Sequence, residues 1–242
     1  MRLLIHNQKG GVGKTTTAAN LGAALLRAGR ARAVLLADLD PQMHLTAMLG
    51  AGTPAGAWNV ADWLSGRAGA PRPVAEEPGL SLIPGAALLP EHMVLPAQDV
   101  PGRWTLLDSA PGWSAQIEAV SHWAELVLCP LEPDFLGLSG ASRLLARFDE
   151  IGVPRSRIRF LLCRFNARLG LHQDVQARLT ERFGPELVMA QTVRSSVRIA
   201  EAPGFGRTIF AHAPGSNGCT DYEHLAKGLA PAGTPVPGRN AA

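Results

Sequence analysis

Residues 7–20 read NQKGGVGKTTTAAN, a glycine-rich stretch that also carries two lysines. It follows a short apolar run and continues into a segment of helical character. Small residues at Gly10, Gly11 and Gly13 leave the backbone N–H groups free to wrap an anion at a helix N-terminus, where the helix dipole also favours negative charge. The stretch therefore predicts a strand, a phosphate-binding loop and a helix in direct succession.

Each polar residue of this loop has an expected role toward a nucleoside triphosphate. Lys14 is expected to reach the β- and γ-phosphates, Thr15 to coordinate Mg²⁺, and Thr16 to contact the α- or β-phosphate. The backbone from Gly10 through Val12 is expected to contribute N–H groups. The first glycine of the usual pattern is absent, because Gln8 stands at that position.

Short apolar runs recur along the chain and alternate with helical segments. Continuous apolar runs are typical of strands buried on both faces, and their alternation with helices favours a parallel sheet with right-handed crossovers. The predicted strands are 3–6, 33–39, 80–84, 104–108, 126–131, 158–165 and 187–191. The predicted helices are 14–28, 59–64, 114–124, 139–151 and 172–183, and glycines that suit left-handed C-caps follow the first and the last two.

These elements predict one α/β domain over residues 1–229, with a mostly parallel, twisted sheet of about 7–8 strands and helices on both faces. Residues 66–79 are predicted to form a Gly/Pro-rich loop, and 230–242 a disordered tail. A chain of 242 residues with 46% hydrophobic residues can bury the core of such a domain. The three cysteines are widely separated, which disfavours a disulfide framework and favours a cytoplasmic protein. No leader sequence is evident, and no apolar run approaches the length of about 20 residues that spans a bilayer.

Three carboxylates follow predicted strands. Asp38 and Asp40 occur in LLADLDPQ, and Asp108 ends the run in WTLLDSAPG. In open parallel sheets ligands bind beyond the carboxyl ends of the strands, so all three should converge on the phosphate loop. Asp108 is expected to hold Mg²⁺ through a water, Asp40 to position or activate the attacking water, and Asp38 to lie near the metal shell. A turn or helix-capping role for each aspartate is the structural alternative.

Several motifs together resemble the ParA/Soj branch of the deviant Walker A ATPases, within the ParA–MinD superfamily of P-loop proteins. They are NQKGGVGKTTTAANL, DLDPQ, LLDSAP, PLEPDFLGLSG, and VRIAEAPGFGRTI followed by HAPGSNG, and they cover nearly the whole chain. The resemblance implies a weak ATP hydrolase that forms ATP-dependent homodimers and binds double-stranded DNA nonspecifically. It also implies a ParB-like or adaptor protein that stimulates hydrolysis, and cargo such as a plasmid, a chromosome region or a protein. Such a protein is cytoplasmic and associates with the nucleoid in its ATP state.

The resemblance gives Lys9, the second lysine of the loop, a role across the dimer, at the nucleotide of the other subunit. A cation placed in trans stabilises charge on a phosphoryl group in the transition state. The alternative is that Lys9 contacts the triphosphate of its own subunit. Arg164 and Asn166, in the CRFN segment, match the position where relatives contact the base, although a surface turn is the alternative.

The resemblance also places DNA-binding residues in the late block, at Arg194, Arg198 and Arg207. Residues 215–218 read GSNG, where the family often carries further arginines, so DNA binding is expected to be weaker. An alternative function is therefore a nucleotide-gated protein-interaction switch with little DNA binding. The Pro/Gly-rich end lacks the basic amphipathic helix of the MinD branch, which disfavours a membrane role.

Overall fold

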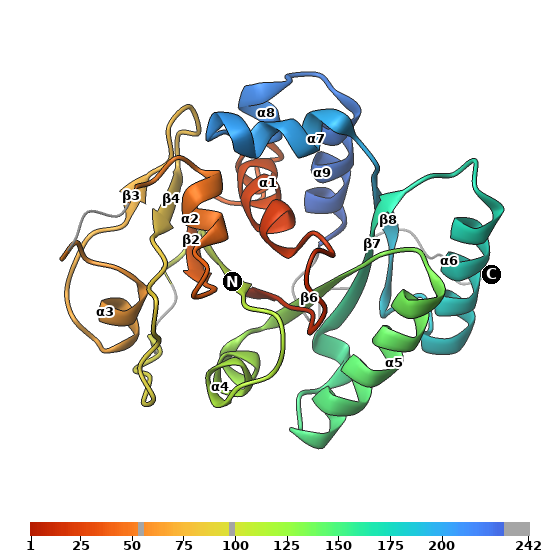
Figure 1. Ribbon diagram of the computed structural model, residues 1–242, viewed down its shortest axis with the longest axis horizontal. Helices are drawn as coiled ribbons and strands as arrows, with labels where there is room; N and C mark the ends of the chain where they lie inside the picture. The colour runs from red at the N-terminus through yellow and green to blue at the C-terminus, as the bar shows by residue number, and fades with distance from the viewer. Residues whose placement is uncertain (53–55, 97–99, 230–242) are drawn as a thin grey trace.

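The computed structural model describes residues 1–52, 56–96 and 100–229. Its centre is an eight-stranded sheet in the order β3-β4-β2-β5-β1-β6-β7-β8 (Figure 1). The strands are β1 Arg2–Ile5, β2 Ala33–Leu39, β3 Arg72–Pro73, β4 Leu80–Ile83, β5 Arg103–Ser109, β6 Leu126–Leu131, β7 Ile158–Phe165 and β8 Val188–Arg194. All pairings are parallel except that of the edge strand β3 with β4. The predicted sheet is confirmed.

Helices cover both faces of this sheet (Figure 1). They are α1 Lys14–Arg27, α2 His44–Met48, α3 Val60–Leu64, α4 Ala115–Trp123, α5 Phe135–Glu150, α6 Gly170–Phe183, α7 Val197–Glu201, α8 Ile209–His212 and α9 Asn217–Gly228, with 3₁₀ turns η1 Arg155–Arg157 and η2 Ala202–Phe205. Leu3 and Ile5 of β1 face the core that contains α1 and α9, whereas Leu4 faces the core beneath α4 and α5. Successive side chains of a strand point to opposite faces, so a continuous apolar run supplies both cores.

The central position of β1 places the phosphate loop over the middle of the sheet. β1 lies between β5 and β6 and runs parallel to both. The loop after β1 therefore meets the loops that follow β2, β5, β6 and β7 at one edge of the sheet, where parallel α/β proteins bind ligands.

Two predicted boundaries differ from the structure for identifiable reasons. Helix α5 begins at Phe135 rather than at residue 139, because Asp134 caps it with a hydrogen bond from Gly137 N (2.5 Å). The predicted loop 66–79 contains β3, which adds the antiparallel edge strand. Gly184 ends α6 with φ of 84° and ψ of 154°, so it is not a left-handed helical cap, unlike Gly29 and Gly152. The predicted tail, 230–242, lies outside the described residues.

The helices after residue 195 were not predicted from the sequence. Helices α7 and α8 are only five and four residues long, too short to show helical periodicity. Helix α9, of 12 residues, was missed although its buried residues follow helical spacing. Helix α9 nevertheless packs on α1 and β8, and Tyr222 and Leu225 are fully buried there. A Cβ at Gly218 would come within 2.8 Å of the Ile199 side chain, so this glycine permits the close approach of α9 to α7. Among the described helices, none is long and apolar enough to cross a membrane.

Candidate nucleotide-binding site

The loop between β1 and α1 has the backbone geometry of a phosphate cradle. Gly11 and Gly13 have φ values of 77° and 96°, a region that L-residues with side chains rarely adopt. Asn7 stabilises the start of the loop, because its side chain donates to Pro130 O (2.7 Å) and accepts from Lys9 N (2.9 Å). Val12 is buried and anchors the loop, so its backbone is held in place. Gly13 is the N-cap of α1.

A cavity of about 660 Å³ opens over this loop. Lys14 lies at its floor, is almost fully buried, and donates to Lys9 O (3.0 Å). Burial lowers the pKa of Lys14, while the carboxylates of Asp108 and Asp40 oppose the change. Thr15 and Thr16 also line the cavity. The structure thus brings together the loop residues that the sequence predicts to bind phosphate, in a space that can hold a nucleotide.

Asp108 is the carboxylate that lacks a partner. Its side chain is fully buried at the end of β5, and among the described residues the Thr15 hydroxyl lies close to it but does not meet the geometry of a hydrogen bond to either oxygen. Burial raises the pKa of Asp108 well above its ordinary value and Asp38 adds to the rise, while the nearby Thr15 hydroxyl and the Lys14 ammonium favour the charged form. A buried carboxylate without a partner is costly, so its presence indicates that something else completes the site.

Asp38 lies beside Asp108 in the sheet but has a different environment. The two residues are register partners on β2 and β5. One oxygen of Asp38 accepts from Thr46 N (2.8 Å) and Thr46 Oγ1 (2.7 Å), and the other accepts from Asp40 N (3.2 Å). Asp38 therefore holds α2 and the loop after β2. The expected place of Asp38 near the metal stays a prediction, since Asp38 lies beside Asp108 while both of its own oxygens accept hydrogen bonds.

Replacing Thr46 with valine is expected to destabilise the fold by about 2 kcal/mol, because Asp38 and Gly85 N both lose the Thr46 hydroxyl as a hydrogen-bond partner in a buried place. The midpoint of chemical denaturation measures this loss. Thr220→Val is the matched control, since Thr220 is exposed on α9. A midpoint for Thr46→Val equal to that of the control would contradict the structural role of Asp38.

Asp40 follows β2 and is nearly buried. One of its oxygens accepts from Gln42 N (2.9 Å), and the other is 3.9 Å from His44 Nδ1. Asp40, Gln42 and His44 all line the cavity. The position is compatible with the expected role of Asp40 toward a water at the terminal phosphate.

A second cavity, of about 360 Å³, adjoins the first and shares Gly13, Thr16 and Arg164 with it. Arg164 stands at φ 56° near the end of β7, an unusual conformation for a residue with a long side chain. Asn166 lines neither cavity, and its side chain accepts from Arg168 N (3.0 Å). Of the two residues expected at the base, the structure thus brings only Arg164 to the site.

Lys9 points away from the cavity of its own loop. Its ammonium lies 2.9 Å from Glu132 Oε2 and 3.8 Å from Asp134 Oδ2, and its side chain is 42% exposed. It lines a separate hollow of about 260 Å³ beside α5. This conformation disfavours the alternative in which Lys9 contacts the triphosphate of its own subunit.

The residues present fit a hydrated Mg²⁺ ion together with a nucleotide. Mg²⁺ prefers oxygen ligands and usually keeps several waters while using one or two protein oxygens and the phosphates of the substrate. Thr15 lines the cavity, and the buried Asp108 carboxylate close to Thr15 offers further oxygens of this kind. A group of three or more His, Cys, Asp or Glu side chains that could hold a metal unaided does not occur among the described residues.

Some residues of the site were missed in the sequence. Pro203 and Gly204, from η2, line the phosphate cavity opposite the loop. Their signal was the EAPGFG block, which was interpreted as a motif of the family resemblance and, through the neighbouring arginines, as a DNA-binding segment, but not as part of the nucleotide site. His6 and Trp113 pack edge to face (4.7 Å between ring centroids), directly beneath the site, and burial lowers the pKa of His6 to about 3.

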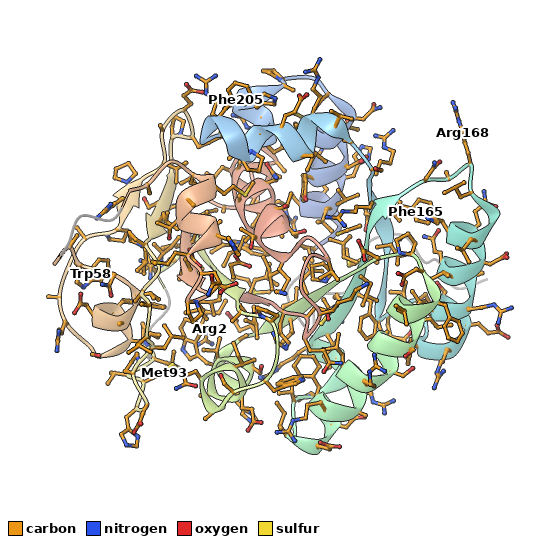
Figure 2. The ribbon with its side chains drawn as sticks, viewed as in Figure 1. Arg2, Trp58, Met93, Phe165, Arg168 and Phe205 are labelled. Carbon is orange, nitrogen blue, oxygen red and sulfur yellow. The ribbon has the colours of Figure 1, made fainter. Side chains whose placement is uncertain are left out.

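The three arginines expected to bind DNA are each paired with a carboxylate. Arg194 forms a bidentate pair with Asp221, in which Nη2 donates to Oδ1 (2.6 Å) and Nε to Oδ2 (3.0 Å). Arg198 Nη1 lies 2.9 Å from Glu201 Oε2, and Arg207 Nη2 lies 2.7 Å from Glu76 Oε1. Arg194 also lines the second cavity. By contrast, Arg168 extends into solvent from the loop before α6 (Figure 2).

Comparison with known proteins gives consistent matches over most of the chain. The family model described as the CobQ/CobB/MinD/ParA nucleotide binding domain matches residues 3–209. The chromosome-partitioning ATPase Soj of Thermus thermophilus is 37% identical over 93% of this chain and 94% of its own length. The chromosome partitioning protein ParA of Caulobacter vibrioides is 31% identical over 93% and 92%.

Solved structures share the fold. McdA from Cyanothece, in its apo form, superposes with a TM-score of 0.72 at 20% identity, covering 93% of this chain and 97% of that one. The septum site-determining protein MinD of Pyrococcus horikoshii, complexed with Mg-ADP, gives a TM-score of 0.68 at 22% identity over 93% and 94%.

Fold and site together define a P-loop nucleotide-binding protein of the α/β class. The chain belongs to the CobQ/CobB/MinD/ParA family, and within it to the chromosome-partitioning ATPases of the Soj and ParA type.

Proposed function

We propose that this protein hydrolyses ATP to ADP and phosphate, forms a homodimer when ATP is bound, and binds double-stranded DNA nonspecifically in that state. A ParB-like or adaptor protein would stimulate hydrolysis and release the dimer from DNA, so that a plasmid, chromosome region or protein cargo is moved or positioned. The observation that carries the proposal is the nucleotide-sized cavity over the phosphate loop, which Lys14 and Thr15 line, together with the buried Asp108 carboxylate close to both of them.

The chain's own residues suit hydrolysis of a triphosphate. Bound Mg²⁺ would neutralise charge on the phosphates, with Thr15 and Asp108 holding it. Lys14 would bind the β- and γ-phosphates together with the backbone N–H groups of the loop. Asp40, which lines the cavity, would orient the water that attacks the γ-phosphate.

Dimer formation is supported by the position of Lys9. The side chain leaves its own cavity and is partly exposed at the surface that carries the carboxyl ends of the strands. A second subunit facing this surface would bring its triphosphate within reach of Lys9. A cation delivered in this way couples chemistry to dimerisation.

To bind DNA, the late arginines must leave their carboxylate partners within the protein and contact DNA phosphates instead. Arg198 and Arg207 form exposed pairs, which are weak and break readily. Arg194 is the poorest candidate, since its bidentate pair with the nearly buried Asp221 joins β8 to α9. Arg198 and Arg207 are therefore the better assignment for phosphate contacts.

Retention on random-sequence DNA tests the proposal. Wild-type protein is expected to bind only with ATP and Mg²⁺, and the affinity should fall steeply as salt rises because counterions are released. Lys14→Ala should abolish this binding together with ATP turnover, since both depend on the nucleotide. Binding measured by fluorescence anisotropy that is identical with and without ATP would contradict the proposal.

A nucleotide-gated interaction switch is the second candidate function. The pairing of all three late arginines with carboxylates favours it, because the pairs reduce the positive charge available to DNA. An ATP-dependent dimer that fails to bind DNA at low salt would support this candidate over the first.

A further inference from the structure

Glu132 lies where three loops of the site meet. It directly follows β6, which stands between β1 and β7 in the sheet. The loop after β1 carries Lys9, and the end of β7 carries Arg164. A side chain at position 132 can therefore reach a cation from each neighbouring strand.

The carboxylate of Glu132 uses each of its oxygens for a different cation. Oε2 accepts from Lys9 Nζ at 2.9 Å, and Oε1 accepts from Arg164 Nη1 at 2.5 Å. The two cations favour the charged carboxylate, so the pKa of Glu132 is lowered, chiefly by the hydrogen bond from Lys9. These contacts join Lys9, which the proposed function places at the nucleotide of the other subunit, to Arg164, which lines the nucleotide cavity of its own subunit.

We propose that Glu132 restrains Lys9 and Arg164 in the nucleotide-free subunit, and that release of Lys9 from Glu132 sets the ATP concentration at which the dimer forms. This inference rests on the proposed ATP-dependent dimer. We call the contact of Glu132 with Lys9 and Arg164 the Glu132 clasp. Glu132 is thus a positioning residue, since it acts through the two cations.

The strength of the Glu132 clasp suits a reversible restraint. The side chain of Glu132 is 22% exposed, while those of Lys9 and Arg164 are 42% and 62% exposed. Water screens pairs of this kind, so each changes an equilibrium by a factor of about two to five. A triphosphate, which carries several negative charges, can compete for either cation.

Occupation of the cavity would weaken the clasp from one side. Arg164 lines the phosphate cavity, so bound nucleotide can draw it away from Glu132. Lys9 is then held mainly by Glu132, with Asp134 more distant at 3.8 Å. When a second subunit approaches, its triphosphate would draw Lys9 away from Glu132 as well. The clasp therefore opposes dimerisation until nucleotide is present.

The first measurement needs no nucleotide. The chain has three lysines, Lys9, Lys14 and Lys227, so acylation with N-hydroxysuccinimidyl acetate can be followed at each by mass spectrometry. Glu132→Gln is expected to raise the acylation rate of Lys9 about two- to five-fold, because the amine loses its carboxylate partner. Exposed Lys227 serves as the internal reference. An unchanged Lys9 rate would overturn the clasp, whether or not the protein hydrolyses ATP.

The second measurement is the ATP concentration at half-maximal dimerisation, by analytical ultracentrifugation. Glu132→Gln is expected to lower this concentration about two- to five-fold. The control is Glu150→Gln, which removes a carboxylate from an exposed pair with Arg147 on α5, away from the cavities. A dimerisation midpoint that is unchanged or higher in Glu132→Gln would overturn the regulatory role. Absence of an ATP-dependent dimer in wild type would instead refute the proposed function, while Lys9 acylation would still decide whether the clasp exists.

Discussion

Lys9→Ala is expected to reduce single-turnover hydrolysis of radiolabelled ATP by the dimer by about 10³-fold or more, as removal of a cation supplied in trans does in other phosphoryl-transfer proteins. Binding of ATP to the monomer should remain within about three-fold of wild type, since Lys9 lies outside the cavity of its own subunit and its loss there costs at most a weak surface interaction. A large loss of turnover with nearly unchanged ATP binding indicates that Lys9 acts on the nucleotide of the other subunit, whereas a role in its own subunit would weaken both.

Lys227→Ala is the matched control for this variant, because Lys227 is an exposed lysine on α9 far along the chain from the loop. Its turnover should equal that of wild type. Loss of ATP binding by Lys9→Ala in proportion to its loss of turnover would place Lys9 on its own triphosphate. Wild-type turnover in Lys9→Ala would exclude the trans role.

Asp108→Asn is expected to abolish Mg²⁺-dependent ATP turnover and yet to stabilise the protein in chelator. The substitution keeps the size of the side chain but removes a buried carboxylate that lacks a hydrogen-bond partner among the described residues. Relief of that cost is expected to be about 1–2 kcal/mol, which raises the melting temperature by about 2–4 °C for each kcal/mol in a domain of this size. Calorimetry in chelator measures the gain.

In the presence of Mg²⁺ and ATP, the melting temperature of wild type should exceed that of Asp108→Asn, the reverse of the order expected in chelator. Wild type is expected to gain melting temperature because ligand binds only the folded state, while Asp108→Asn should gain much less. Asp38→Asn serves as the contrast, since Asp38 already accepts three hydrogen bonds and should lose stability in chelator. A melting temperature of Asp108→Asn below that of wild type in chelator would contradict the description of Asp108 as an unpartnered group.

Much of the fold followed from local patterns in the sequence. The run 33–39 and the glycines around Gly13 are local signals, and the structure contains the predicted strand, loop and helix at those positions. The elements that escaped prediction are held by tertiary contacts. Helix α9 is one, since its place depends on Gly218 meeting α7 and on Tyr222 entering the core against α1.

Some features of the candidate site likewise follow from local sequence patterns, whereas others depend on tertiary contacts. The sequence identified Lys14, Thr15 and the three aspartates, because a phosphate site and the ends of parallel strands have recognisable spacing. It could not tell Asp38 from Asp108, because both end a buried strand. Only hydrogen bonding separates them: Thr46 satisfies Asp38, and no described residue satisfies Asp108.

The sequence by itself determined the fold class, the phosphate loop and the family, because these depend on residues that are neighbours along the chain. The tertiary structure decided which carboxylate remains free for a metal, where Lys9 points, and that Glu132 joins Lys9 to Arg164. The contact of Lys9 with Glu132 spans 123 residues of the chain and that of Glu132 with Arg164 spans 32, although β1, β6 and β7 are neighbours in the sheet. Their partners are set by strand order and side-chain geometry, which no local pattern in the sequence encodes.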